Sequence, residues 1–386
     1  MKRFWLSVIS LVIFPWLLKA GVTIEVSNPG NTAISREVAA ADWKTLQDSL
    51  PGLTPENARV RQGSGEVLVS QPVDNDGDGR IDELLFLVSL SAKEKKSFEL
   101  VADSSLKMPE PKARAFARYV PERKDDFAWE NDLVAFRAYG PALKEGAENC
   151  GIDCLFKRVD YPVLDKWYAA EKKGKSYHVD TGEGYDGYKV GSSLGCGGSA
   201  VWAGGELIKS EVYTGQRQIA SGPIRAVFEL SYGPWEAAGK KVTEKKIISI
   251  DLGRQMFKVS DAFFIDGKPA KLDIAVGVTT HGGLAQAYSN KDLGYLYGWE
   301  KIDGYYVGTA VAVAPGAVKE YKLLDSKKQD EGHALFIIPT TDQGKITYYA
   351  GFAWEKAGKI TSREQWEKYL ESFVNDLKNP VEVKVK

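Results

Sequence analysis

Apolar and polar residues alternate along most of the chain from residue 118 onward. Within residues 225–232 the even positions are Ala, Phe, Leu and Tyr, while the odd positions include Arg, Val and Glu. Residues 272–278 and 346–354 repeat this period of two, and glycines separate such runs. A period of two places alternate side chains on opposite faces of a strand. The pattern predicts a mainly β protein whose main body is a large antiparallel β-sandwich.

The N-terminal part of the chain predicts a smaller, β-rich region. Residues 21–106 contain short strand patterns separated by turn residues, with one short helix at 43–49 that a Pro-Gly pair ends. Residues 107–117 are rich in Pro, Lys and Arg and predict a linker. The β-sandwich is then expected to occupy residues 118–386, with few helices.

One further helix is marked near the C-terminus. Ser362 can cap its start, Gln365 completes a capping box, and an apolar stripe follows at helical spacing as far as Phe373. Pro380 ends this helix, and the segment VEVKVK predicts a final strand.

The extreme N-terminus predicts export. Lys2 and Arg3 precede an apolar run at 4–18 that is too short to span a bilayer, and Ala20 offers a small residue for cleavage. We therefore expect a signal peptide at 1–20 and a periplasmic or secreted mature protein. No cysteine follows the expected cleavage site and no later apolar run is long enough to span a membrane, so we expect no membrane partner for the mature form.

Charge and cysteine content narrow the possible partners. The formal net charge is -1 with both signs spread along the chain, which does not indicate a nucleic-acid surface. Cys150 and Cys154 are close enough in sequence to form a disulfide, which would leave Cys196 free; a Cys/His metal site lacks a second close pair. The chain also has 10 tryptophans and 18 tyrosines, residues that stack on sugars and fill β-cores. The oligomeric state is not indicated.

The densest group of ionisable residues is the segment YHVDTGEGYDGYK at 177–189. It places an imidazole, phenols, carboxylates and an ammonium among three glycines, too many ionisable groups for a core strand. Proton transfer and sugar recognition use these groups. His178, Tyr185, Tyr188 and Lys189 are therefore candidate site residues. The alternative is a tyrosine-rich polar surface loop.

Further candidates lie on strands or beside aromatic residues. Arg137 could hold a carboxylate through two parallel hydrogen bonds, although an ion pair with Glu130 or Asp132 is the alternative. His281 follows an apolar strand at its end, where rigid scaffolds present catalytic groups. The further candidates for substrate contact are Trp129, Asn131, Lys157, Trp167, Trp202, Arg225 and His281.

An aspartate-rich turn resembles the first part of a calcium loop. Asp74, Asp76 and Asp78 occupy alternate positions and Gly79 the sharp turn, but the twelfth position, which should carry a bidentate carboxylate, is Leu85. A strand pattern follows in place of a helix, which excludes an EF-hand. We favour an Asp/Gly turn before a buried strand, with a bound calcium as the alternative and no other cofactor expected.

Several segments together resemble one known family. In order along the chain they are WENDLVAFRAYGPAL, GIDCLFKR, DKWY, YHVDTGEGYDGYKVGSSLGCGGSAVW and ASGPIRAVFELSY. They are similar to successive signatures of a family of secreted bacterial carbohydrate-active proteins, long described as a domain of unknown function, that includes the ulvan oligosaccharide dehydratase. The segments GPIRAVFELSY and KKIISIDLGRQMFKVSDAFF also resemble the supersandwich of galactose-mutarotase-like domains, which agrees with the sandwich predicted from alternation.

The resemblance implies a reaction. Water is lost from the non-reducing-end uronic acid of an acidic, ulvan-type oligosaccharide, giving a 4,5-unsaturated residue without cleavage of the chain. Such a reaction needs a cation or strong donor at the carboxylate, a base for the C5 proton and an acid for the departing 4-hydroxyl. Our hypothesis assigns His178 and Tyr188 as the base–acid pair and Lys189 and Arg137 to the carboxylate. The expected stacking platforms are Trp129, Trp167 and Trp202.

Other functions fit the same residues. A polysaccharide lyase would use the same C5 abstraction but expel a sugar, whereas a glycoside hydrolase would need two carboxylates at a set separation. A non-enzymatic sugar-binding module would need the aromatic residues but not the concentrated proton-transfer groups.

Overall fold

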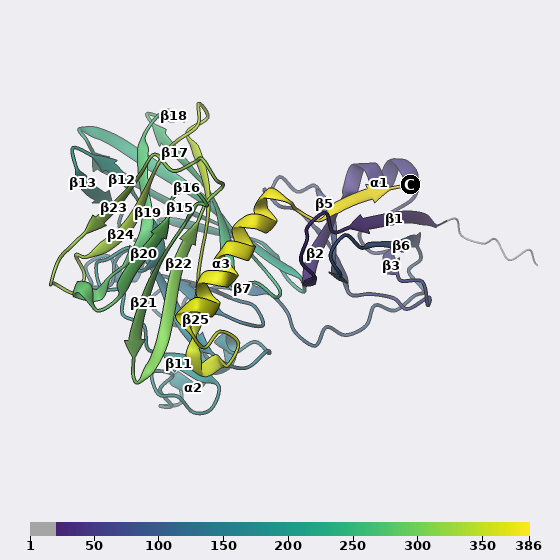
Figure 1. Cartoon of the computed structure of the whole chain (residues 1–386), viewed down its shortest axis with the longest axis horizontal. Helices are drawn as coiled ribbons and strands as arrows, with labels where there is room; N and C mark the ends of the chain where they lie inside the picture. The colour runs from purple at the N-terminus through teal and green to yellow at the C-terminus, as the bar shows by residue number, and fades with distance from the viewer. Residues whose placement is uncertain (1–20) are drawn as a thin grey trace, which may run out of the picture.

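The computed structural model describes residues 21–386, so the predicted signal peptide at 1–20 lies outside the described residues. The chain forms a small N-terminal lobe and a large β-sandwich, shown side by side in Figure 1. The fold is mainly β with antiparallel sheets, as the alternating pattern predicts. Within residues 21–386, no helix combines the length and apolarity that a membrane crossing requires.

The N-terminal lobe consists of two small sheets that enclose their own core. One sheet has the order β26-β1-β6-β3 and the other the order β2-β5-β4. Val26, Leu46, Phe86 and Leu100 are among the residues buried between them. The strands are β1 (Val22–Ser27), β2 (Ile34–Asp42), β3 (Ala58–Arg61), β4 (Ser70–Val73), β5 (Glu83–Leu90), β6 (Lys95–Ala102) and β26 (Glu382–Val385).

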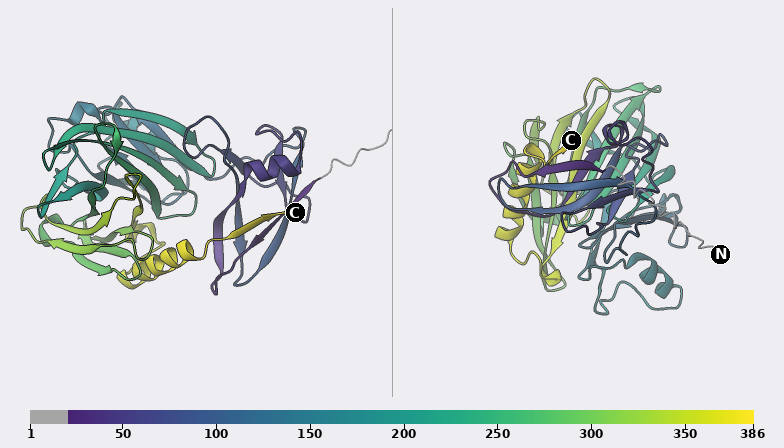
Figure 2. Two further views of the ribbon diagram at one scale, coloured as in Figure 1. Left: turned by 90° about the horizontal axis from the view of Figure 1, so that it is seen from above. Right: turned by 90° about the vertical axis from the view of Figure 1, so that its right-hand side faces the viewer.

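The last strand returns to the N-terminal lobe. β26 pairs antiparallel with β1, so that Val383 lies opposite Val26. Figure 2 shows this yellow strand beside the purple strands of the N-terminal lobe. The prediction that residues 118–386 form one sandwich is therefore wrong for this strand, because the apolar side chains of VEVKVK are needed to cover the N-terminal core.

The sandwich packs one wide sheet against two narrower ones. The wide, nine-stranded sheet has the order β14-β15-β16-β17-β25-β22-β21-β20, with β18 pairing to β17. Its strands are β14 (Gly215–Ser221), β15 (Arg225–Ala237), β16 (Lys240–Asp251), β17 (Met256–Ile265), β18 (Lys268–Pro269), β20 (Gln286–Asn290), β21 (Tyr295–Ile302), β22 (Tyr305–Ala312) and β25 (Lys345–Trp354).

The facing layer consists of two five-stranded sheets, with the orders β11-β10-β9-β8-β7 and β13-β12-β19-β24-β23. Their strands are β7 (Phe116–Val120), β8 (Asp126–Glu130), β9 (Ala135–Ala138), β10 (Ile152–Lys157), β11 (Gly184–Asp186), β12 (Cys196–Ala203), β13 (Glu206–Lys209), β19 (Asp273–Thr279), β23 (Glu320–Leu324) and β24 (His333–Pro339). β7 begins at Phe116, inside the predicted linker, which is shortened by this strand.

The predicted alternation decides which side chains fill the sandwich core. Ala226, Phe228 and Leu230 of β15 point into it, as do Tyr348 and Phe352 of β25. Apolar side chains on every second position can be buried on one face while the other face stays available for a different contact. The outward face of the wide sheet is therefore available to pack against α3 and the N-terminal lobe.

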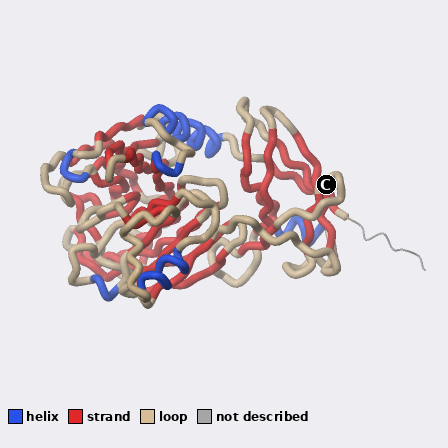
Figure 3. Tube along the Cα trace, turned by 90° about the horizontal axis from the view of Figure 1, so that it is seen from below, coloured by secondary structure: helices blue, strands red, loops and turns tan. Residues whose placement is uncertain are grey.

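Residues 21–386 contain three α-helices, which pack beside the sheets, and Figure 3 shows how little of this part of the chain is helical. The first, α1, is capped by Asp42, whose side chain accepts a hydrogen bond from the Thr45 amide. The third, α3, is capped by Ser362 as predicted and lays Trp366 and Phe373 on the outer face of the wide sheet. The helices are α1 (Trp43–Ser49), α2 (Leu164–Glu171) and α3 (Arg363–Lys378), and the 3-10 turns are Pro141–Leu143, His281–Gly283 and Glu355–Ala357.

The N-terminal lobe docks on the outer face of the same sheet. Leu85 of β5 packs against Val227 of β15, which explains why an apolar residue occupies the otherwise polar face of that strand. Arg36 forms an ion pair with Asp132 of the sandwich, with 2.6 Å between its guanidinium and the carboxylate. The two lobes and α3 therefore meet over one surface.

Candidate active site between the lobes

A cleft of about 480 Å³ opens where the N-terminal lobe, the wide sheet and α3 meet. Its size falls within the range of small-molecule sites, which also prefer domain boundaries. The N-terminal lobe contributes Asn28, Ile34, Glu37, Val38, Ala40, Asn75 and Glu83 to its lining; the wide sheet and its turns contribute Arg225, Ile247, Ser249, Asp251, Arg254, Met256, Lys258, Ser260 and Tyr349; α3 and the segment after it contribute Phe373, Asp376, Leu377, Asn379, Pro380 and Val381.

The floor of the cleft is one row of side chains across three neighbouring strands. Ser249 of β16 lies opposite Lys258 of β17, and Lys258 lies opposite Tyr349 of β25. Directly opposed residues on antiparallel strands have Cβ atoms about 5 Å apart. A hydroxyl, an ammonium and a phenol therefore lie side by side on this floor.

At one end of the cleft, Arg225 forms ion pairs and hydrogen bonds with residues of both lobes. It bonds both oxygens of Asp251, at 2.6 and 2.9 Å, and reaches Glu83 and Asn75 of the N-terminal lobe at 3.1 and 3.0 Å. Burial disfavours its charge, but Asp251 and Glu83 raise the pKa of Arg225 overall. The residue predicted to contact substrate thus lies in the cleft, where it joins the two lobes.

Arg254 forms a second link between the lobes. Its guanidinium forms an ion pair with Glu37 of β2 and lies over the Phe373 ring of α3, 5.5 Å from the ring centroid. Burial raises the pKa of Glu37, and Arg254 partly offsets this. Asp376 of α3 is only loosely associated, 3.9 Å from the same guanidinium.

Three ionisable side chains of the cleft are left without such bonds. Lys258 has no ion pair and Tyr349 has no hydrogen bond within residues 21–386, and Asp376 has no hydrogen-bond donor there beyond its loose contact with Arg254. Burial raises the pKa of Tyr349, and the Arg254 cation partly offsets this effect. The cleft therefore offers one ammonium, one protonated phenol and one carboxylate to a ligand.

Asn131 and Asp132 fix the turn between β16 and β17, which follows Asp251 and contains Arg254. The Asn131 side chain donates hydrogen bonds to the carbonyls of Asp251 and Arg254, each 2.7 Å long, and Asp132 accepts one from the Gly253 amide. Asn131 was predicted to contact substrate. Asn131 is buried and does not line the cleft. Its role is to fix the backbone of Asp251 and Arg254, which do line it.

The structure places the predicted carboxylate ligand Arg137 in a closed network. Arg137 is 1% exposed and bonds Asp153 at 2.5 Å, Asp186 at 2.9 Å and the Tyr177 hydroxyl at 3.2 Å. Burial under α2 and three nearby aspartates, the third being Asp126, leave it no open edge for a sugar. The predicted contact between Arg137 and a substrate carboxylate therefore conflicts with this arrangement.

The predicted base–acid pair and the other predicted carboxylate ligand, Lys189, do not share one pocket. His178 is exposed at the rim of the Arg137 network, with Nδ1 3.3 Å from the Asp186 carbonyl. Lys189 is exposed, whereas the Tyr188 ring is buried against His281, with 4.9 Å between centroids. Since the Tyr188 hydroxyl lies in the core, it cannot act on a bound sugar with His178 in this conformation.

His281 and Tyr185 are held by carboxylates. His281 is buried, with Nδ1 2.7 Å from Glu300 and Nε2 2.6 Å from the Lys189 carbonyl. The Tyr185 hydroxyl donates to Asp303 at 2.8 Å. These contacts tie the segment 177–189 to the sandwich and do not leave either group facing the interlobe cleft.

Three of the four other predicted contact residues are buried. Trp129 is fully buried between Phe136 and Phe228, which contradicts its stacking role. Lys157 is buried against Glu130 at 2.8 Å, and Trp167 is buried on α2. Trp202 of β12 is half-buried and lies outside the lining of the cleft.

All three cysteines are free thiols, and all three are buried. Cys150 lies against the carbonyl of Ser193, with 3.1 Å between sulfur and oxygen. The disulfide that the spacing of Cys150 and Cys154 allows is therefore not formed in this structure.

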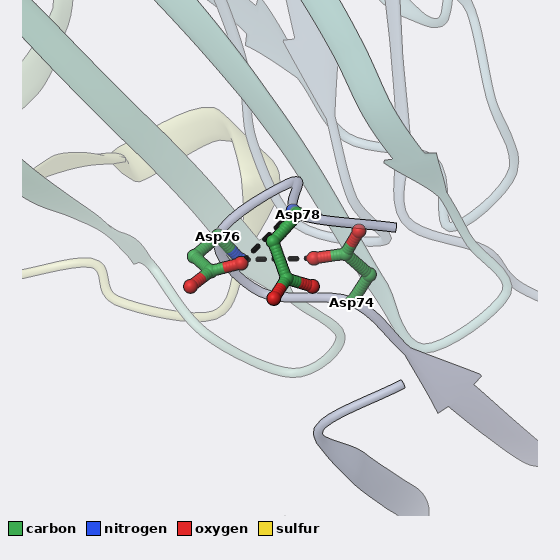
Figure 4. Close-up of side chains that lie close together, drawn as sticks. All are labelled: Asp74, Asp76 and Asp78. Atoms are coloured by element: carbon green, nitrogen blue, oxygen red, sulfur yellow. Dashed lines mark hydrogen bonds between the residues drawn. The ribbon is translucent and has the colours of Figure 1, made fainter. Parts of the chain in front are cut away.

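The aspartate-rich turn folds on its own backbone. The ligand atoms of Asp74, Asp76 and Asp78 lie within 4.8 Å of one another, and Figure 4 shows two of the hydrogen bonds between the three residues. Asp74 accepts from the amides of Asp76 at 3.1 Å and of Gly79 at 2.9 Å. These bonds fit the favoured turn interpretation, while calcium binding stays a prediction.

Sequence reasoning missed Lys258, Tyr349 and Asp376. Lys258 and Tyr349 stand at outward positions of the strand patterns MFKVSD and ITYYAGF, and Asp376 lies three residues after the apolar stripe of α3 ends at Phe373. Alternation shows that Lys258 and Tyr349 face outward from their strands, and the helical stripe places Asp376 beyond its last apolar residue. Neither pattern shows that these three residues meet.

Sequence comparison places the chain in a family. Residues 26–383 match the model described as "Domain of unknown function (DUF4861)". The chain is 36% identical over 331 residues to "Uncharacterized protein P7" of Formosa agariphila, covering 83% of this chain and 82% of that protein.

Structural comparison identifies a fold relationship. The chain is similar to a protein in the glycosyl hydrolase family 38 from Enterococcus faecalis (TM-score 0.52, 10% identity, 96% of this chain and 48% of that chain). It is also similar to an α-mannosidase from Enterococcus faecalis V583 (TM-score 0.50, 11% identity, 95% of this chain and 46% of that chain). The chain thus spans about half the length of the solved structures that it matches. At these identities the likeness concerns the fold alone.

Proposed function

This chain belongs to the DUF4861 family, and we propose that it removes water from the non-reducing-end uronic acid of an acidic oligosaccharide bound in the interlobe cleft. The observation that carries the proposal is that Lys258 and Tyr349 have no ion pair or hydrogen bond within the described residues, in a cleft whose arginines are both paired. The fold also occurs in an α-mannosidase, which is compatible with a carbohydrate substrate.

Lys258 supplies the charge that the reaction needs at the substrate carboxylate. The C5 proton of a uronic acid lies next to this carboxylate and becomes acidic only when the negative charge that develops there is stabilised. Because Arg225 and Arg254 are engaged by Asp251 and Glu37, Lys258 is the cation of the cleft that can approach the ligand. It lies on the floor, with its side chain exposed to the cleft.

Tyr349 protonates the departing hydroxyl. Its raised pKa keeps the phenol protonated at neutral pH, so it is a proton donor. The free carboxylate of the cleft takes the C5 proton, the C5–H and C4–O bonds break, a C4=C5 double bond forms, and the 4-hydroxyl leaves as water with the proton from Tyr349. No other bond of the chain is cleaved.

Incubation with oligosaccharides that end in a uronic acid, followed by mass analysis, tests this function. Dehydration gives one product lighter by one water, whereas a lyase gives two fragments and a hydrolase adds water. If Tyr349 is the proton donor, the Tyr349→Phe variant should turn over substrate roughly a hundredfold or more slowly than the wild-type protein. Tyr306→Phe is the matched control, because Tyr306 is exposed at the hairpin between β21 and β22, outside the cleft lining.

One further variant separates this proposal from a site at residues 177–189. His178→Ala should keep wild-type turnover if the cleft is the active site, and should lose turnover if His178 is the base. Binding of the oligosaccharide with no conversion of it by the wild-type protein would instead indicate a sugar-binding module.

A further inference from the structure

One carboxylate of the cleft differs from the other three. Asp251, Glu37 and Glu83 each bond an arginine of the cleft. Asp376 has no hydrogen-bond donor within the described residues, and its nearest guanidinium nitrogen is 3.9 Å away. Its oxygens are therefore free to accept a proton from a ligand.

Arg254 lies between Glu37 of the N-terminal lobe and Asp376 of α3. It is oriented by its ion pair with Glu37 and by the Phe373 ring beneath it. One terminal nitrogen of its guanidinium contacts Glu37, and the other lies 3.9 Å from Asp376, so the bond to Glu37 limits how far the guanidinium turns toward Asp376. Burial raises the pKa of Asp376 and Arg254 only partly offsets this, so the carboxylate is a stronger base than a solvated aspartate.

Asp376 lies beside the proposed proton donor. Phe373 stands one helical turn before Asp376 on α3, and its ring contacts the Tyr349 ring with 5.1 Å between centroids. Residues three apart on a helix share one face. Asp376 and Tyr349 therefore border the same part of the cleft from the helix and from the sheet, and both line its cavity.

We propose that Asp376 is the catalytic base that removes the C5 proton, and that Glu37 positions it by holding Arg254. This inference rests on the proposed dehydration. The Asp376 carboxylate gains the C5 proton, and the C5–H electron pair first moves into the substrate carboxylate held by Lys258. This pair then forms the C4=C5 bond while the C4–O pair leaves with the proton of Tyr349. Transfer of the new proton from Asp376 through water to the Tyr349 phenolate restores the starting state.

Hydrogen–deuterium exchange at C5 separates the two halves of the reaction. In deuterated water, Tyr349→Phe should still exchange the C5 proton of the substrate while dehydration falls roughly a hundredfold or more. Asp376→Asn should lose both exchange and dehydration by a similar factor. Glu371→Gln is the matched control, since Glu371 lies on the same helix but outside the cleft lining.

The outcomes separate an error in the assignment of Asp376 as the base from an error in the proposed function. If the wild-type protein dehydrates its substrate and Asp376→Asn still exchanges C5 at the wild-type rate, Asp376 is not the base while the proposed function stands. If the wild-type protein neither exchanges nor dehydrates any uronic-acid-ended oligosaccharide, the function is wrong and the role of Asp376 falls with it. Thermal unfolding of each variant shows whether a loss reflects misfolding.

Glu37→Gln tests the positioning role. Without the ion pair, Arg254 can approach Asp376 and lower the pKa of the base, so the acidic limb of the kcat/KM profile should move to lower pH. A profile that keeps its position, with only an overall loss of stability, would show that Glu37 is merely structural.

Discussion

Lys258 and Tyr349 are direct cross-strand partners on β17 and β25, on the face of the wide sheet that floors the interlobe cleft. Neither side chain is held by an ion pair or hydrogen bond within residues 21–386, whereas the arginines around them are. A ligand can therefore contact this pair without displacing an existing bond.

Lys258→Met should weaken binding of acidic oligosaccharides by about 10- to 100-fold, because a charged hydrogen bond contributes about 1.5–3 kcal/mol. Steady-state kinetics should show a lower kcat as well, because Lys258 also stabilises the charge that develops on the carboxylate during the reaction, while binding of neutral oligosaccharides should be unchanged. Calorimetric titration at two salt concentrations checks the binding of both kinds of oligosaccharide. Lys301→Met, at the β21–β22 hairpin, is the matched control; an equal loss in both variants would contradict a specific role for Lys258.

Arg225→Ala should destabilise the protein by about 3 kcal/mol, because it leaves the partly buried Asp251 and Glu83 without their shared cation. Urea unfolding monitored by tryptophan fluorescence measures this. An unchanged midpoint would show that the lobes are held by other contacts. Arg217→Ala removes a more exposed arginine of the neighbouring strand and should have a much smaller effect.

His281 should make stability depend on pH. Burial lowers its pKa, but the bond to Glu300 raises it above its ordinary value overall. The protonated ring therefore stabilises the fold fully below the unfolded pKa of about 6.5, and this stabilisation is lost as the pH rises through the higher folded pKa.

Thermal unfolding of the wild-type protein and of His281→Gln between pH 5 and 9 tests this dependence. The difference in stability between them should shrink as the pH rises through the folded pKa of His281. A difference that is constant over this range would show that the ring does not titrate there.

Lys384→Pro should selectively loosen the N-terminal lobe. Lys384 lies opposite Glu25, in the same hydrogen-bonded set as Lys386, whose amide donates to the Thr23 carbonyl of β1. Proline at this position removes a ladder hydrogen bond between β26 and β1. We expect a loss of roughly 2 kcal/mol from the bonds affected. Amide exchange should accelerate in β1 but not in β19 of the sandwich; uniform acceleration would indicate a single cooperative unit.

Local pattern was sufficient for much of the fold. The inward residues of β15, β19 and β25 follow directly from alternation, because one buried face requires apolar residues at every second position. The predicted cap at Ser362 locates the start of α3 for the same local reason. The sequence pattern did not predict α2. Its position over the Arg137 network depends on contacts with strands that are distant in sequence.

The site depended on information that a single strand does not contain. Trp129 and Arg137 have side chains suited to sugar contact, but the packing of Phe228 and of α2 over them decides that they are buried. Lys258 and Tyr349 come from strands about ninety residues apart, and only the register of β17 against β25 brings them together. The residue types therefore indicate which chemistry the side chains can perform, but the pairing of strands distant in sequence decides where those side chains lie.

The return of β26 to β1 has a consequence for biosynthesis. β1 is synthesised before the sandwich, yet one of its two neighbours is residues 382–385, which are synthesised after it. The N-terminal lobe therefore has an open strand edge while the sandwich is being synthesised. A chain interrupted before these residues would carry that edge permanently, and unpaired edges favour aggregation.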